Sequence, residues 1–137
     1  MLLSFLRKYP LSILIILTIT YLSFFNPPAD TDLAKIPNID KIVHTIMYMG
    51  LSGMLWFEFL WGHRADKAPL WHAWVGAFLC PIVFSGIIEI LQENCTTYRG
   101  GDWFDFLANI TGTTLATLLL FFVVRPYIEH KTKHKRT

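Results

Sequence analysis

Long apolar runs separated by short polar stretches dominate the pattern of this chain. The runs occupy residues 9–25, 40–61, 71–92 and 103–124. A helix needs about 20 mainly apolar residues to cross the hydrocarbon layer of a bilayer, and these runs meet or approach that length. Prolines in the first connection and paired glycines in the third mark breaks between them. The pattern therefore predicts an all-α fold, a bundle of four transmembrane helices.

Composition supports this prediction. The chain has 137 residues, of which 53% are hydrophobic and only 16% charged, and its mean hydropathy is +0.42. A small soluble domain needs a larger polar shell over its core. We expect residues 1–137 to form a single integral membrane domain.

The distribution of basic residues predicts an orientation. They concentrate at Arg7 with Lys8, in residues 64–67 and in the tail of residues 125–137. Lys and Arg favour the cytoplasmic side, so four crossings would place both termini and this tail in the cytoplasm, in contact with anionic lipid. A nucleic-acid partner is not predicted. The loops of residues 30–41 and 93–99 would face outside.

Polar side chains cluster at the ends of the second, third and fourth runs that this topology places outside. Asp40, His44 and Tyr48 are spaced four residues apart and share one helical face. The whole set comprises Asp40, Lys41, His44, Tyr48, Glu89, Gln92, Arg99, Asp102, Asp105 and Asn109. Asp102 also precedes the fourth run in the manner of a helix N-cap.

Burial costs predict that these side chains converge. An ionised Asp, Lys or Arg at mid-helix costs about 2.5–3.5 kcal/mol on insertion scales. Facing lipid separately, several such groups would oppose folding, whereas facing inward they can pair with each other. We therefore predict one outward-facing polar pocket between the second, third and fourth helices, with His44, Glu89 and Asp105 as its candidate catalytic groups.

At these residues the chain resembles the VanZ-like family of small bacterial membrane proteins. The resemblance rests on Asp40-Lys41-x-x-His44-x-x-x-Tyr48, Glu89-x-x-Gln92, Arg99 and Asp105-x-x-x-Asn109-x-x-Gly112. It covers residues 39–120 and implies a four-helix protein of the bacterial cytoplasmic membrane. Members named for the family are linked to low-level resistance to the glycopeptide teicoplanin, which implies a process in the cell envelope rather than a particular reaction.

Three hypotheses about function follow. The first is a pocket that binds or acts on an envelope amphiphile, such as a lipid-linked cell-wall precursor or a lipoglycopeptide, with Lys41 and Arg99 holding a phosphate. The second is an intramembrane hydrolase or transferase that uses His44 with Glu89 or Asp105 on a lipid substrate. The third is a structural or partner-binding bundle. Small residues suited to close helix packing and to a homo-oligomer lie at Gly50 with Gly53 and at Ala108, Gly112 and Ala116.

The remaining chemistry-bearing residues give weaker signals. Asp40, His44, Glu89 and Asp105 are donor types that suit a divalent metal. No dedicated metal motif is present, so no metal or cofactor is predicted. Cys80 and Cys95 would lie roughly 20 Å apart on one helix, too far to form a disulfide. Glu58, near the inner end, is expected to pair with Arg64 or Arg125.

Overall fold

The computed structural model describes residues 2–25, 32–66, 68–97 and 100–134, and within these ranges the chain is helical with no strand. The predicted all-α class is therefore confirmed. The elements are α1 (Leu2–Lys8), α2 (Pro10–Phe25), the 3₁₀ helix η1 (Asp32–Lys35), α3 (Ile39–Gly62), α4 (Trp71–Ala73), the π-helix η2 (Trp74–Leu79), α5 (Cys80–Cys95), α6 (Trp103–Leu119), the π-helix η3 (Leu120–Val124) and α7 (Arg125–His134).

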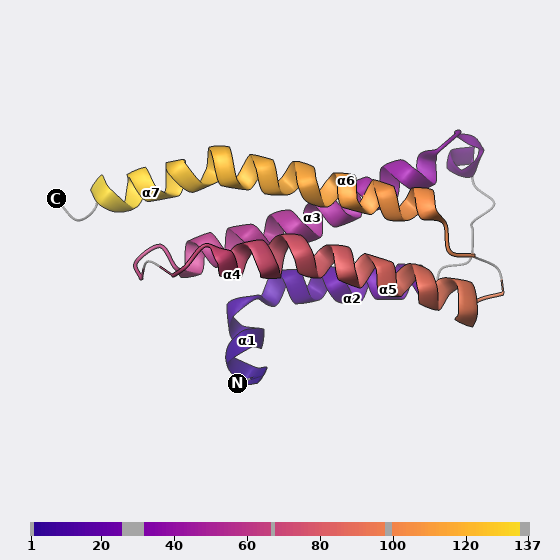
Figure 1. The fold of residues 1–137 in the computed structure, drawn as a ribbon, viewed down its shortest axis with the longest axis horizontal. Helices are drawn as coiled ribbons and strands as arrows, with labels where there is room; N and C mark the ends of the chain where they lie inside the picture. The colour runs from indigo at the N-terminus through magenta and orange to yellow at the C-terminus, as the bar shows by residue number, and fades with distance from the viewer. Residues whose placement is uncertain (1, 26–31, 67, 98–99, 135–137) are drawn as a thin grey trace.

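The helices form four rods that run roughly along one another (Figure 1). The first rod is α2, the second is α3, the third joins α4, η2 and α5, and the fourth joins α6, η3 and α7. Successive rods run in opposite directions, so α1 and α7 lie at the same end of the bundle. The beginning of α3, the end of α5 and the beginning of α6 consequently meet at the opposite end, on the right in Figure 1.

Helix lengths bear on the membrane prediction. Among the described residues, the continuous helices Trp71–Cys95 and Trp103–His134 are long and apolar enough to cross a membrane. Pro10–Phe25 is also apolar but shorter. The fourth helix continues well past the predicted end at residue 124, because the basic tail is itself helical as far as His134.

Pro81 shapes the third rod and connects it to α3. Proline has no N–H group, so Pro81 cannot donate to the Ala77 carbonyl one turn earlier. The hydroxyl of Ser52 in α3 donates to that carbonyl instead, at 2.6 Å. The π-helical segment η2 immediately precedes this point, where the regular hydrogen-bond ladder is interrupted. A fully buried serine thus compensates for a proline on a different helix.

The closest approach between rods is that of α3 and α6 at Gly112. A Cβ atom built on Gly112 would overlap the backbone carbonyl of Thr45 and lie 3.0 Å from the amide nitrogen of Met49. Only glycine allows the two backbones this contact. The predicted role of Gly112 in close helix packing is therefore confirmed, whereas Gly50 has no atom within 4 Å of such a Cβ.

Glu58 does not form the salt bridge predicted with Arg64 or Arg125. Its carboxylate accepts hydrogen bonds from the backbone amides of Leu11 and Ser12, at 2.9 and 3.2 Å, and from the Ser12 hydroxyl at 2.6 Å. The first amides of a helix have no partner within the helix, and the helix dipole favours a negative charge there. Glu58 on α3 therefore caps α2 and connects the first rod to the second.

Candidate functional site

The entry into α6 fixes one side of the site. Asp102 is the predicted N-cap, and its Oδ1 accepts the backbone amide of Phe104 at 2.8 Å. That hydrogen bond, followed by the contact with Lys41, lowers the pKa of the Asp102 carboxyl. The backbone amide of Asp102 donates to Glu89 Oε2 at 3.1 Å. A Cβ on Gly101 would lie 2.6 Å from the Glu89 carbonyl, so this glycine permits the close approach of the chain to α5.

Three ionisable side chains from three helices meet beside this entry. His44 comes from α3, Glu89 from α5 and Asp105 from α6, and they are only 3%, 8% and 6% exposed. One side-chain donor atom from each lies within 4.8 Å of those of the other two. Helix packing thus places residues separated by 45 and 16 positions in one buried cluster, which we call the buried triad.

The orientation of His44 is set by Asn109. His44 Nδ1 lies 3.1 Å from Asn109 Oδ1, and Asn109 Nδ2 donates to the Ser85 hydroxyl at 2.7 Å. Since the Asn109 oxygen can only accept, His44 Nδ1 carries a proton and donates it to this bond. The other ring nitrogen, Nε2, lies 3.5 Å from Asp105 Oδ2. The imidazole therefore presents Nε2 to the buried triad.

Lys41 connects the buried triad to the rim of the bundle. Its Nζ lies 2.6 Å from Asp40 Oδ2 and 3.2 Å from both Asp102 Oδ2 and Asp105 Oδ1. The Lys41 side chain is 28% exposed, and those of Asp40 and Asp102 are more exposed still. One ammonium group thus contacts two carboxylates at the surface and one in the interior.

Gln92 lies apart from the triad, whereas Tyr48 is buried beside Ser85 and Glu89. Gln92 donates to the backbone carbonyl of Ser23 in α2 at 3.0 Å, so it connects α2 to α5 instead of facing the triad. Tyr48 is buried one turn below His44, and its ring packs near that of Phe84 at a centroid distance of 6.3 Å. Arg99 lies outside the described residues.

A cavity of about 270 Å³ adjoins the triad on its α5–α6 side. It is lined by Gly86, Glu89, Ile90, Glu93, Gly101, Asp102, Trp103 and Phe106. The acidic residues Glu89, Glu93 and Asp102 are among those that line the cavity, whereas Ile90, Trp103 and Phe106 make much of its wall apolar. Trp103 is 79% exposed and Ile90 63%, so the walls reach the outside of the bundle. Such a cavity suits a ligand with one polar and one apolar part.

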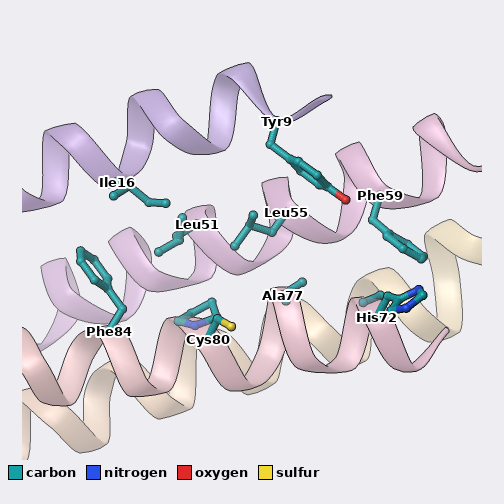
Figure 2. Close-up of a pocket in the computed structure, with 12 residues that line it drawn as sticks. Tyr9, Ile16, Leu51, Leu55, Phe59, His72, Ala77, Cys80 and Phe84 are labelled. Atoms are coloured by element: carbon teal, nitrogen blue, oxygen red, sulfur yellow. The ribbon is translucent and has the colours of Figure 1, made fainter. Parts of the chain in front are cut away.

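A second cavity, which was not predicted from the sequence, lies between α2, α3 and the third rod (Figure 2). Its volume is about 340 Å³, and its walls are largely apolar. Figure 2 shows Phe84 at one end and Tyr9 with His72 near the other. Cavities of this kind arise from imperfect packing between helices, and no local sequence pattern records them.

Comparisons with protein families, with curated proteins and with solved structures gave no match to this chain. The functional argument consequently depends on the geometry of the chain itself.

Proposed function

We propose that the chain is a VanZ-like membrane protein of the bacterial cytoplasmic membrane that crosses the bilayer four times, with both termini cytoplasmic. Support comes from the four antiparallel rods and from the two helices of membrane-spanning length. The large number of exposed apolar side chains along the rods, Leu14, Leu17, Val83 and Phe122 among them, also suits a lipid environment. The basic residues at the end shared by α1 and α7 support the proposed orientation.

We infer further that the protein binds or acts on an amphiphile of the cell envelope, such as a lipid-linked cell-wall precursor or a glycopeptide antibiotic. The observation that carries this proposal is the cavity of about 270 Å³, which joins the carboxylate of Glu89 to apolar walls at the outside of the bundle. A lipid chain would contact Ile90, Trp103 and Phe106 there. The polar part of the ligand would lie toward Glu89, Asp102 and the ammonium group of Lys41.

The topology is tested by reporters of membrane sidedness placed on both ends of the bundle. A reporter inserted after Lys35 and one fused after Thr137 are expected to report opposite sides, the first outside and the second cytoplasmic. If both reporters respond on one side of the membrane, the beginnings of α3 and α6 do not face outside, and the pocket proposed here has no access to the outer leaflet.

The ligand class is tested by resistance in a susceptible bacterial host. Expression of the wild-type chain is expected to raise the concentration of teicoplanin needed to stop growth, and Glu89→Gln and His44→Gln are expected to abolish this protection. Both substitutions keep a polar side chain at the site. Glu89→Gln removes the carboxylate, and His44→Gln removes the imidazole. Membrane levels of each variant are measured by immunoblot.

Glu129→Gln is the matched control, because Glu129 accepts a hydrogen bond from Arg125 within α7 and lies at the opposite end of the bundle. It should protect as well as the wild type. Full protection by both site variants at normal membrane levels would remove the buried triad from the function.

A further inference from the structure

We propose that the buried triad of His44, Glu89 and Asp105 binds one divalent transition-metal ion. The three side chains supply one imidazole nitrogen and two carboxylates, and they come from three different helices. Their donor atoms lie within 4.8 Å of one another, somewhat farther apart than the roughly 3.4 Å between two ligands of a tetrahedral zinc ion, so the side chains would close around a bound ion. A mixed nitrogen and oxygen donor set of this kind suits Zn²⁺ and neighbouring first-row ions.

The hydrogen bonds of His44 prepare it as a ligand. Metal-binding histidines usually donate their second N–H to an oxygen acceptor, which fixes the tautomer and the ring orientation. His44 Nδ1 makes such a bond to Asn109 Oδ1 at 3.1 Å, and Ser85 in turn holds Asn109. In neutral His44 the lone pair of Nε2 therefore points toward the two carboxylates, where an ion would lie.

The distance between His44 Nε2 and Asp105 Oδ2 is also close to the distance between two ligands of one metal ion. Nε2 and Asp105 Oδ2 are 3.5 Å apart, which is long for a charge-assisted hydrogen bond. Two ligands about 2.1 Å from one ion at the tetrahedral angle lie roughly 3.4 Å apart. A cation placed between this nitrogen and this carboxylate oxygen would be held by both.

A second group of carboxylates, formed by Asp40, Asp102 and Asp105, is already matched by a cation from the chain. Lys41 Nζ lies within 3.2 Å of an oxygen on each of them. Asp105 divides its two oxygens, with Oδ1 on Lys41 and Oδ2 on His44. The ammonium group thus lies where an ion bound by these three carboxylates would lie, and the metal is assigned to the buried triad alone.

The metal assignment depends on this geometry and not on the proposed amphiphile. If both proposals hold, the ion and Lys41 together would favour an anionic, phosphate-bearing head group, since a bound divalent cation attracts and polarises phosphoryl oxygens. That choice of head group rests on the proposed function. The metal content can be measured with no amphiphile present.

The test is the zinc content of the purified protein. The full chain in detergent is stripped with a chelator, equilibrated with Zn²⁺, freed of unbound ion and analysed by elemental mass spectrometry. We expect about one ion per chain for the wild type. His44→Gln, Glu89→Gln and Asp105→Asn are each expected to weaken binding at least tenfold, because each removes one ligand from the set.

Glu129→Gln is the control and should retain one ion, because Glu129 pairs with Arg125 at the opposite end of the bundle. Because ligand variants can fail to fold, Co²⁺ is also added to the wild type, where visible absorption bands of a low-symmetry site are expected and Zn²⁺ should abolish them. A wild type that retains no zinc and gives no cobalt spectrum overturns the proposal, and so does equal zinc retention in the three ligand variants. Either result leaves the resistance experiment, and hence the proposed function, to be judged separately.

Discussion

Gly112→Ala is expected to destabilise the protein by about 3 kcal/mol, at the upper end of the range for overpacking a tight interface. The added Cβ would overlap the Thr45 carbonyl and press on the Met49 amide, and both are backbone atoms that no rotamer change can move. α3 and α6 must therefore separate. Thermal unfolding in detergent should show a fall of roughly 10 °C in the melting temperature.

Gly50→Ala is the matched control, since it makes the same chemical change on α3 with no atom within 4 Å of the new Cβ. Alanine favours helix over glycine by about 1 kcal/mol, so this variant should be as stable as the wild type or more so. Equal melting temperatures for both variants would show that the α3–α6 contact does not need glycine. Separation of the two helices should also disturb the bond between His44 and Asn109, which lies one turn from Gly112 on α6.

Lys41→Met is expected to destabilise the protein by about 2 kcal/mol, somewhat less than the 3–5 kcal/mol for breaking a fully buried ion pair. The change removes the only ammonium that contacts Asp40, Asp102 and Asp105 among the described residues. Asp105 lies in the interior and would lose the ammonium group that contacts its Oδ1. The expected loss of stability is smaller than for a fully buried pair because Lys41 is partly exposed to solvent. Thermal unfolding at neutral pH measures it.

Two further variants make this result specific. Lys35→Met removes an ammonium from the exposed pair with Asp32, and such surface pairs contribute about 0–1 kcal/mol, so little change is expected. Adding Asp105→Asn to Lys41→Met should recover part of the lost stability, because the uncompensated buried charge is then absent. The contrary result is additivity. If the loss of stability in the double variant equals the sum of the losses in Lys41→Met and Asp105→Asn, the two side chains act independently.

Local patterns were enough to predict the helices and some of their ends. The apolar runs predicted the all-α class, because burying or embedding such runs requires their backbone groups to be hydrogen-bonded within the helix. Asp102 was recognisable as an N-cap from its position before the fourth run, since capping involves only neighbouring residues. The boundaries of α3 also agree closely with the prediction, whereas the extension of the fourth helix through its basic tail does not follow from hydropathy.

The partners of individual side chains were decided by the packing of the rods. The sequence around Glu58 does not indicate that it caps α2, and the sequence around Gln92 does not indicate that it donates to Ser23. Both hydrogen bonds depend on how α2 packs against α3 and α5. The tautomer of His44 depends on Asn109, which is 65 positions away in the sequence.

The positions at which polar groups interrupt the apolar runs can be read from the residues alone, since each position is a property of one helix. Which of those groups meet depends on how the helices pack. Three helices cross at fixed offsets, and a rotation of any one of them by a single residue, about 100°, would carry His44, Glu89 or Asp105 off the shared face. That rotation is set by contacts such as Gly112 against Thr45 and Ser52 against Ala77, which join residues far apart along the chain.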